Sequence, residues 1–283
     1  MGGWYDRYDE GTARHGAGTE GYDKGYDRVR KGTLAPMAVS SLERVTIPNS
    51  YAPKRPITVY LPAGHDPKVH APLLILHDGQ NLFDPARAHV QGQHWRVAET
   101  ADELIAAGAI PPIVIAGIDH AGDERGNEMT PTPGDHAGAG GGGIYGRFVM
   151  GEVVPYLARE FGVRTDRDGI SMGGASLGGL ATLAIARQFP GRIGRLLLMS
   201  PSVWWDNRVI LRRLQRVGLA GRPRVWLDIG RREGAQTVTD TRLLRNVLLW
   251  QTSALKYVED PEGRHSEADW ARRLPDALTW LYA

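Results

Sequence analysis

Eight short apolar runs alternate with amphipathic stretches along most of this 283-residue chain, and this alternation restricts its fold more than any other feature. The first two runs, residues 43–51 and 55–64, are rich in β-branched residues and bounded by Pro, Asn or Gly, which favours an antiparallel strand pair. The other six are nearly continuous apolar segments, typical of strands buried on both faces. They span residues 72–79, 111–119, 168–173, 194–202, 224–230 and 254–260.

Five helices are expected between and after these runs, because apolar residues recur there near helical spacing. They span residues 95–108, 144–162, 177–190, 242–254 and 267–283. Strands and helices in alternation predict an α/β domain with a mostly parallel sheet and helices on both faces. Since the carboxyl ends of parallel strands gather at one edge of a sheet, we expect the ligand site at that edge.

The composition excludes several classes of protein. The 34 Lys and Arg residues nearly balance the 32 Asp and Glu residues, so no overall field favours nucleic acid or an anionic membrane. The absence of cysteine excludes disulfides, thiolate nucleophiles and Cys-based zinc sites. No segment reaches the roughly 18 apolar residues of a membrane helix, and residues 1–16 do not resemble an export signal. We therefore expect a soluble, cytoplasmic protein that acts on a small molecule; a homodimer is compatible with these features.

Two parts are expected along the chain. Residues 1–35 are rich in Gly, Tyr and charged residues and contain almost no aliphatic side chains, so they cannot build a core of their own. We interpret them as an N-terminal arm, either a tail or a cover over a cleft or a neighbouring subunit. Residues 36–283 should form the catalytic domain.

The segment GASLG, residues 174–178, has the pattern G-x-S-x-G between an expected strand and an expected helix. In this context the pattern is a nucleophile elbow, whose tight turn exposes a serine hydroxyl above the sheet edge. Gly174 and Gly178 would allow the strand and the helix to approach closely. We predict that Ser176 is a nucleophile, the alternative being a turn with a capping serine. Ser171 is the weaker candidate because it lacks the flanking glycines.

A serine nucleophile needs a general base, and the base needs an acid that orients it. In the α/β-hydrolase fold these residues follow the chain order Ser, then Asp or Glu, then His. Only one histidine, His265, comes after Ser176, so we predict that it is the base. Its loop directly follows the apolar run 254–260, which places it at the expected site edge. The sequence thus predicts an eight-stranded α/β-hydrolase fold whose chemistry requires no cofactor.

Three acidic residues between Ser176 and His265 could complete the triad. Glu233 is favoured because it lies in a loop beyond the run 224–230, where a side chain can turn toward the histidine. Asp228 is second, since it lies inside that run and the alternation of a strand leaves its direction open. Asp206 is interpreted as a cleft or salt-bridge residue.

An oxyanion hole requires two preset N–H donors. One should be the backbone N–H of Leu177, the residue after the nucleophile, and the other should come from Gly79 or Gln80 in the loop after the first long buried run. His77 and Asp78 in that loop suggest a metal site only weakly, because further spaced ligands are missing. We therefore predict no bound metal.

Five ordered motifs resemble the esterase family of α/β-hydrolases, over about residues 40–283. The motifs are LHDGQNLFD, GASLGGLA, SPSVWWD, DIGRREG and EGRHSEADW. This family includes enterochelin-type siderophore esterases, feruloyl and acetyl-xylan esterases, S-formylglutathione hydrolases and mycolyltransferases. The resemblance implies that Ser176 is the nucleophile, His265 the base and Glu233 the acid of a Gly-x-x-acid pattern.

Two substrate-binding residues are expected from the same resemblance. Arg125 begins a segment similar to the Arg-x-x-Glu-Tyr-x-Pro pattern of siderophore-esterase-like members, although Met129 replaces the Tyr. Trp204 and Trp205 could form an aromatic wall, with Trp205 expected to contact the substrate.

We predict a serine carboxylic ester hydrolase that forms an acyl-enzyme and takes a small-molecule ester. An acyltransferase using the same triad is the first alternative, since it differs only in the acceptor of the acyl group. A binding protein that kept the fold without catalysis is the second, and the presence of all three triad residues favours the enzyme.

Overall fold

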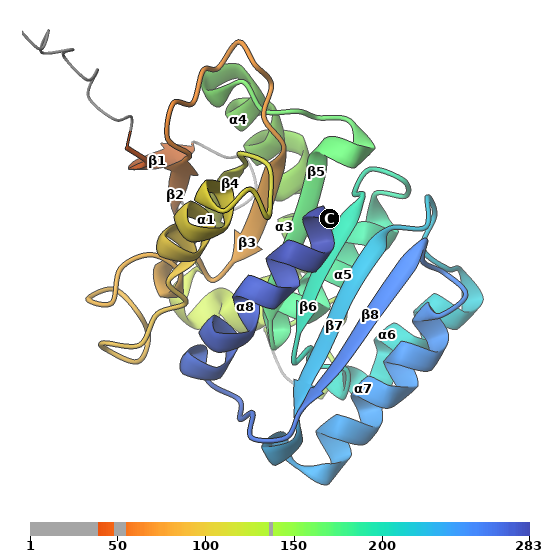
Figure 1. The fold of residues 1–283 in the computed structure, drawn as a ribbon. Helices are drawn as coiled ribbons and strands as arrows, with labels where there is room; N and C mark the ends of the chain where they lie inside the picture. Colours follow the sequence, from red (N-terminus) through yellow and green to blue (C-terminus); the bar gives the residue numbers. More distant parts are fainter. Residues whose placement is uncertain (1–38, 48–54, 136–137) are drawn as a thin grey trace, which may run out of the picture. The chain divides into compact units, whose positions relative to one another are not determined.

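One eight-stranded sheet forms the centre of the catalytic part of the chain (Figure 1). The computed structural model describes residues 39–47, 55–135 and 138–283, so the predicted N-terminal arm lies outside the described residues. In spatial order the strands are β1 (Ser41–Ile47), β2 (Arg55–Leu61), β4 (Val114–Ile118), β3 (Leu73–His77), β5 (Ile170–Ala175), β6 (Arg195–Met199), β7 (Arg224–Gly230) and β8 (Ala254–Asp260).

The strand directions confirm the predicted mostly parallel sheet. The first two strands, β1 and β2, form an antiparallel pair, and β2 is also antiparallel to β4. All other neighbouring strands, from β4 through β3 to β8, run parallel. This α/β-hydrolase arrangement places the carboxyl ends of β3 to β8 at one edge of the sheet.

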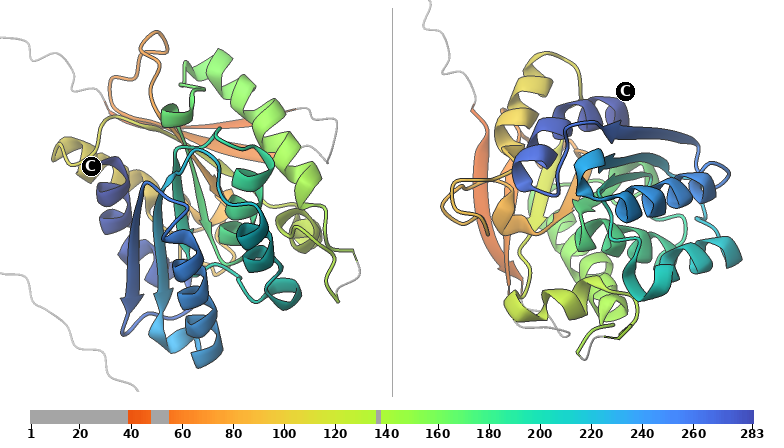
Figure 2. Two further views of the ribbon diagram at one scale, coloured as in Figure 1. Left: turned by 90° about the vertical axis from the view of Figure 1, so that its right-hand side faces the viewer. Right: turned by 90° about the horizontal axis from the view of Figure 1, so that it is seen from below.

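Helices cover both faces of the sheet (Figure 2). The α-helices are α1 (Val97–Ala106), α2 (Arg125–Met129), α3 (Gly142–Phe148), α4 (Val154–Phe161), α5 (Leu177–Gln188), α6 (Trp205–Arg216), α7 (Ala235–Leu248) and α8 (Glu267–Tyr282). Shorter helical turns are η1 (Gly79–Asn81), η2 (Gly122–Glu124), η4 (Arg167–Gly169), η5 (Arg231–Glu233) and the π-helical η3 (Val149–Val153) between α3 and α4. None of the helices in the described ranges combines the length and the apolarity that a membrane span requires.

Two separate hydrophobic cores fill the spaces between the sheet and these helices. Alternate residues of β3 point to opposite faces, so Leu73 belongs to the core under α3 to α7, and Leu74 to the core under α1 and α8. Both side chains are fully buried. The continuous apolar runs of the sequence therefore follow from burial on both faces of the sheet.

The structure differs from the sequence-based expectation at three helices. Residues 125–129 form α2 and residues 205–216 form α6, although we expected loops there, and α7 begins at Ala235 rather than at Arg242. Residues 206–208 have positive φ, and Asp and Asn at the first two of these positions favour turns over a helix start. The first turns of α7 are rich in Thr, a weak helix former, whose hydroxyls here donate to backbone carbonyls of the preceding turn.

The junction of β5 and α5 depends on small residues. Only Ser176 separates the strand from the helix. A Cβ atom on Gly174 would lie 3.0 Å from the carbonyl carbon of Gly178, and one on Gly179 would lie 2.9 Å from Cβ of Pro201. The close approach of strand and helix that we expected from these glycines is thus present.

We expect Gly174→Ala to lower the free energy of unfolding by about 1–3 kcal/mol, because the added methyl group meets backbone atoms of α5 that cannot move away. Urea unfolding followed by circular dichroism measures the change. Gly143→Ala is the matched control: nothing lies within 4 Å of its added Cβ, and alanine is the better helix former in α3. Equal destabilisation by both substitutions would contradict the steric explanation.

Candidate active site

Ser176 lies in strained backbone between β5 and α5. Its φ of 56° and ψ of −122° are unusual for a residue with a side chain. Backbone hydrogen bonds hold this conformation: the Ser176 N–H donates to the carbonyl of Met199 over 3.0 Å, and the Ser176 carbonyl accepts from the N–H of Ser202 over 3.0 Å. The neighbouring strand β6 and its following loop therefore fix the elbow in place.

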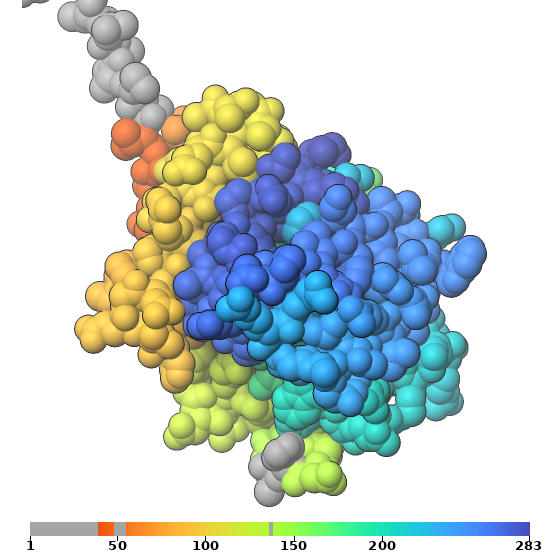
Figure 3. Space-filling view, turned by 60° about the horizontal axis from the view of Figure 1, so that its bottom comes forward, coloured from red at the N-terminus to blue at the C-terminus, as the bar shows by residue number. Residues whose placement is uncertain are grey.

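A cavity of about 590 Å³ opens at the carboxyl ends of the strands. It brings Ser176 together with His265, although 88 residues of sequence separate them. Figure 3 shows this edge of the sheet, with the orange to yellow segment after β3 on one side and the dark blue start of α8 beside it. The lining residues are Asp78, Gln80, Asn81, His89, Val90, Trp95, His120, Gly122, Asp123, Arg125, Ala175, Ser176, His265, Glu267 and Trp270.

A larger groove of about 710 Å³ lies between α6 and α7 and includes Arg208 and Trp250 in its lining. It contains none of the residues predicted for the site. The chemistry is therefore sought in the cavity beside Ser176.

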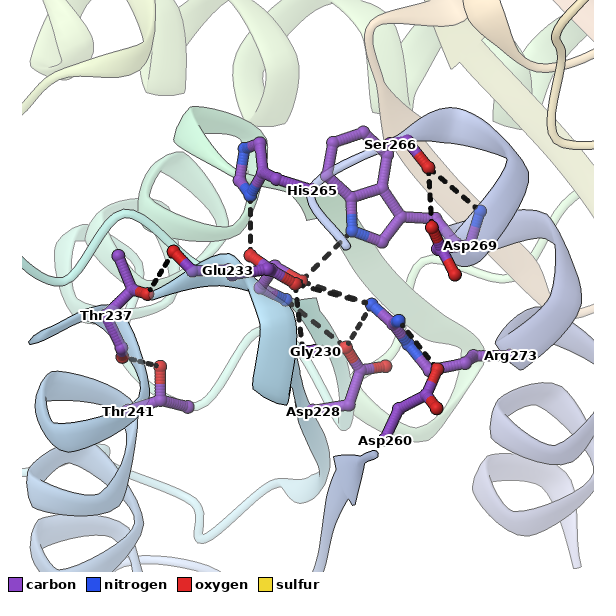
Figure 4. A network of polar contacts seen from close by, with 12 residues as sticks. Asp228, Gly230, Glu233, Thr237, Thr241, Asp260, His265, Ser266, Asp269 and Arg273 are labelled. Carbon is purple, nitrogen blue, oxygen red and sulfur yellow. Dashed lines mark hydrogen bonds and ion pairs between the residues drawn. The ribbon is translucent and has the colours of Figure 1, made fainter. Parts of the chain in front are cut away.

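Glu233 makes the hydrogen bond to His265. The acid ends η5, directly after β7, and its Oε2 lies 2.6 Å from His265 Nδ1 (Figure 4). The side chain of Glu233 is only 1% exposed. Burial alone would raise its pKa, but hydrogen bonds from His265, from the Ser200 hydroxyl and from the Gly230 N–H together hold the pKa of Glu233 below its ordinary value.

The same hydrogen bond fixes which nitrogen of His265 carries a proton. An ionised carboxylate can only accept hydrogen bonds, so Nδ1 must be the donor, and in the neutral ring Nε2 is left as an acceptor. The imidazole also meets the Trp270 ring edge-on, with centroids 4.9 Å apart and an interplanar angle of 83°. These contacts orient a basic nitrogen at the cavity.

Within the described residues, no hydrogen bond joins Ser176 to His265. The Ser176 hydroxyl lies instead 3.3 Å from the hydroxyl of Ser202. Hydrogen bonds between nucleophile and base are often loose without substrate and shorten in the substrate complex.

The structure places the two alternative acids elsewhere. Asp228 is fully buried and accepts from the indole N–H of Trp226 over 2.8 Å, while its other oxygen lies 3.1 Å from the Arg273 guanidinium. Burial raises the pKa of Asp228, and Arg273 and Trp226 oppose that rise. Asp206 lies at the start of α6, beside Gly134. The acid that accepts the hydrogen bond from His265 is Glu233 rather than either aspartate.

Two of the residues expected at the oxyanion hole are near Ser176: Leu177 follows it in the chain, and Gln80 lines the same cavity. Leu177 is the first residue of α5, so its N–H has no acceptor within the helix. Gly79 and Gln80 lie in η1 after β3, and Gln80 lines the cavity. A Cβ on Gly178 would lie 3.2 Å from Cβ of His77, which shows how closely the start of α5 packs against the end of β3.

His77 and Asp78, which suggested a metal, make other contacts. His77 is buried, its Nδ1 lies 2.8 Å from the Tyr145 hydroxyl, and burial lowers its pKa to about 4. Asp78 accepts two hydrogen bonds from Arg125, over 2.7 and 2.9 Å. Over the described ranges, no group of three or more His, Cys, Asp or Glu residues is arranged to hold a metal ion.

Arg125 lies in the cavity wall, as predicted for a substrate-binding residue. Its helix α2 is held by a buried pair of hydrogen bonds between Arg55 of β2 and Glu128, one of which spans 2.7 Å. Glu128, the acidic residue of the Arg-x-x-Glu segment, therefore anchors the helix that carries Arg125.

The prediction that Trp205 contacts the substrate is wrong. Trp205 is 5% exposed, belongs to the core under α3 to α7, and donates its indole N–H to the carbonyl of Thr132 over 3.0 Å. It does not line the cavity, whereas Trp204 is 46% exposed. The Trp205 side chain packs against the segment that contains Thr132 and Gly134.

Sequence reasoning missed several residues of the site. Ser202 contacts Ser176 through both its hydroxyl and its backbone N–H, and Ser200 donates to Glu233 over 2.6 Å. Both follow β6, which neighbours β5 and β7, so the strand order would have indicated them. His120, which lies shortly after β4, and Glu267, the first residue of α8, also line the cavity. No motif in the sequence around either residue indicated a site.

Comparison with known proteins identifies the family to which the chain is similar. A family model described as "Putative esterase" matches residues 49–281. Protein YbbA of Bacillus subtilis is 25% identical over 82% of this chain and 94% of its own length. The iron(III) enterobactin esterase of Dickeya dadantii is 34% identical over 54% of this chain. The chain spans only 31% of that esterase.

Solved structures agree on the fold. An IroE-like serine hydrolase from Shewanella oneidensis matches this chain with a TM-score of 0.71. The two are 18% identical, and the match covers 86% of this chain and 80% of the hydrolase chain. At that identity the likeness concerns the fold alone. Because the family model covers most of the chain and the fold agrees with it, this chain belongs to the esterase family of α/β-hydrolases.

Proposed function

We propose that this protein hydrolyses carboxylic esters through an acyl-enzyme, with Ser176 as nucleophile, His265 as general base and Glu233 as the orienting acid. The observation that carries the proposal is the 2.6 Å hydrogen bond from His265 to Glu233, at the wall of the cavity that holds Ser176. Family membership supports the reaction class.

The proposed first step forms the acyl-enzyme. His265 Nε2 takes the proton of the Ser176 hydroxyl while Oγ attacks the ester carbonyl carbon. The N–H of Leu177 and an N–H of Gly79 or Gln80 stabilise the negative oxygen of the tetrahedral intermediate. The intermediate then collapses, and the imidazolium gives its proton to the departing alcohol.

Water completes the reaction. His265 takes a proton from a water molecule, whose oxygen attacks the acyl carbon, and Ser176 leaves with that proton. The products are a carboxylic acid and an alcohol. Buried, ionised Glu233 stabilises the imidazolium in both steps because its carboxylate faces Nδ1.

The cavity wall supports a polar small-molecule ester as substrate. Arg125 and His120 line the cavity together with Trp95 and Trp270, so the site offers both hydrogen-bond donors and aromatic surface. Curated relatives named as enterobactin and salmochelin esterases suggest siderophore esters as compounds to test, although this chain spans about a third of each.

We expect Ser176→Ala to reduce turnover of p-nitrophenyl acetate and butyrate by at least about 10³-fold, because no acyl-enzyme can form. Mass spectrometry after treatment with a fluorophosphonate should show one adduct on the wild type and none on the variant. Ser171→Ala is the control: this buried serine accepts a hydrogen bond from Tyr282 at the other end of β5. Turnover by Ser176→Ala equal to that of the control would refute the assignment.

Glu233→Gln and Asp228→Asn separate the two buried acids. We expect Glu233→Gln to lower kcat by about 10²- to 10⁴-fold with little change in KM, since an amide cannot stabilise the imidazolium. Asp228→Asn should mainly lower the melting temperature, because it removes one of the two buried carboxylates that contact Arg273. Steady-state kinetics well below each melting temperature give the comparison. A folded Asp228→Asn protein that loses as much kcat as Glu233→Gln would sink the choice of acid.

A further inference from the structure

Ser200 occupies a special position behind Glu233. It directly follows β6, is 2% exposed, and has a φ of 44°. Its N–H donates to the carbonyl of Asp228 over 3.0 Å, which ties it to the neighbouring strand β7. The end of β6 and the hydrogen bond to β7 thus hold the Ser200 hydroxyl inside the protein, where it contacts α8.

The Ser200 hydroxyl has three partners. It lies 2.6 Å from Glu233 Oε1, 3.1 Å from the indole nitrogen of Trp270 and 3.1 Å from Arg273 Nη2. A serine hydroxyl offers one donor and two acceptor sites. Trp270 and Arg273 can only donate, so they occupy both acceptor sites, and the single hydroxyl proton must point to Glu233.

We infer that Ser200 is a positioning residue, whose hydroxyl proton is aimed at Glu233 by Trp270 and Arg273 so that only one carboxylate oxygen remains for His265. Oε1 already accepts from Ser200 and from the Gly230 N–H over 2.8 Å. Oε2 is the oxygen that contacts the imidazole. The inference rests on the proposed triad and adds the hydrogen bonds, from Ser200 and its two donors, that orient Glu233.

Arg273 makes this arrangement of hydrogen bonds rigid. Its guanidinium is 5% exposed and also contacts Asp228 over 3.1 Å and Asp260 over 3.3 Å. Asp228 lies within β7 and Asp260 ends β8, while Arg273 itself comes from α8. The charged groups that face Glu233 are His265 and, at 4.0 Å, Arg273. Because a buried charge held by two carboxylates cannot rotate freely, the donor that fixes the Ser200 proton stays in place.

A replacement of Ser200 by alanine tests the inference through kcat, KM and the pH profile. We expect Ser200→Ala to lower kcat by about 10- to 100-fold, the rate equivalent of one hydrogen bond to a charged group, with KM within about twofold. Loss of a donor makes ionised Glu233 less stable and raises its pKa. The fall of kcat/KM on the acid side should therefore begin at higher pH than in the wild type.

Two further variants control for folding. Ser171→Ala removes another buried hydroxyl that is far from Glu233, and it should leave kcat and the acid side of the profile unchanged. Ser200→Cys keeps a similar shape with a weaker donor in a chain without other cysteines, so its kcat should lie between those of Ser200→Ala and the wild type. Fluorophosphonate labelling gives the fraction of folded, reactive protein by which each kcat is corrected.

The outcomes separate this inference from the proposed function. If Ser200→Ala matches Ser171→Ala in kcat and in its acid limb while Glu233→Gln is inactive, the inference is overturned and the triad stands. If Glu233→Gln keeps wild-type activity, the proposed triad itself fails. If Ser200→Ala does not fold, a kcat for Ser200→Cys equal to that of the wild type overturns the inference, and a reduced kcat with a shifted acid limb supports it.

Discussion

Parallel pairing of β3, β5, β6, β7 and β8 is the constraint on which the rest of the structure depends. Each parallel connection needs a crossover, so helices cover both faces, and β3, β5, β6 and β7 are largely buried on both sides. The polar residues are then left to the strand ends. Because all five strands end at one edge, the segments after them meet there, and side chains distant in sequence share one cavity.

Hydrogen-bond partners, rather than burial, distinguish Asp228 from Glu233. Both side chains are inaccessible, but Asp228 lies 3.1 Å from the Arg273 guanidinium, whereas the hydrogen bonds to Glu233 come from the Ser200 hydroxyl, the Gly230 N–H and the imidazole of His265. A carboxylate committed to a buried cation cannot move without leaving that charge unpaired. Asp228 and Arg273 are thus better suited to hold the framework, and Glu233 to meet a charge that appears during the reaction.

Two residues with strained backbone, Ser176 and Ser200, lie at the carboxyl ends of neighbouring strands. Ser176 and Ser200 both have positive φ, and each is the residue that follows a central strand. Their neighbours compensate by hydrogen bonds from adjacent strands: Ser176 N–H reaches β6, and Ser200 N–H reaches β7. Backbone hydrogen bonds to the adjacent strands therefore maintain both strained conformations.

Local sequence was sufficient for the strands, the elbow and the order of Ser176 and His265, because strand periodicity, glycine spacing and chain order are properties of short segments or of their sequence. It was insufficient for Trp205, since the helix α6 that buries this side chain begins with turn-forming residues. The contact of Glu233 with His265, and the roles of Ser200, Ser202 and Arg273, required the tertiary structure. Ser200 and Ser202 follow β6, Glu233 follows β7 and Arg273 lies on α8. Only the packing of these elements decides which polar atoms come within hydrogen-bond distance.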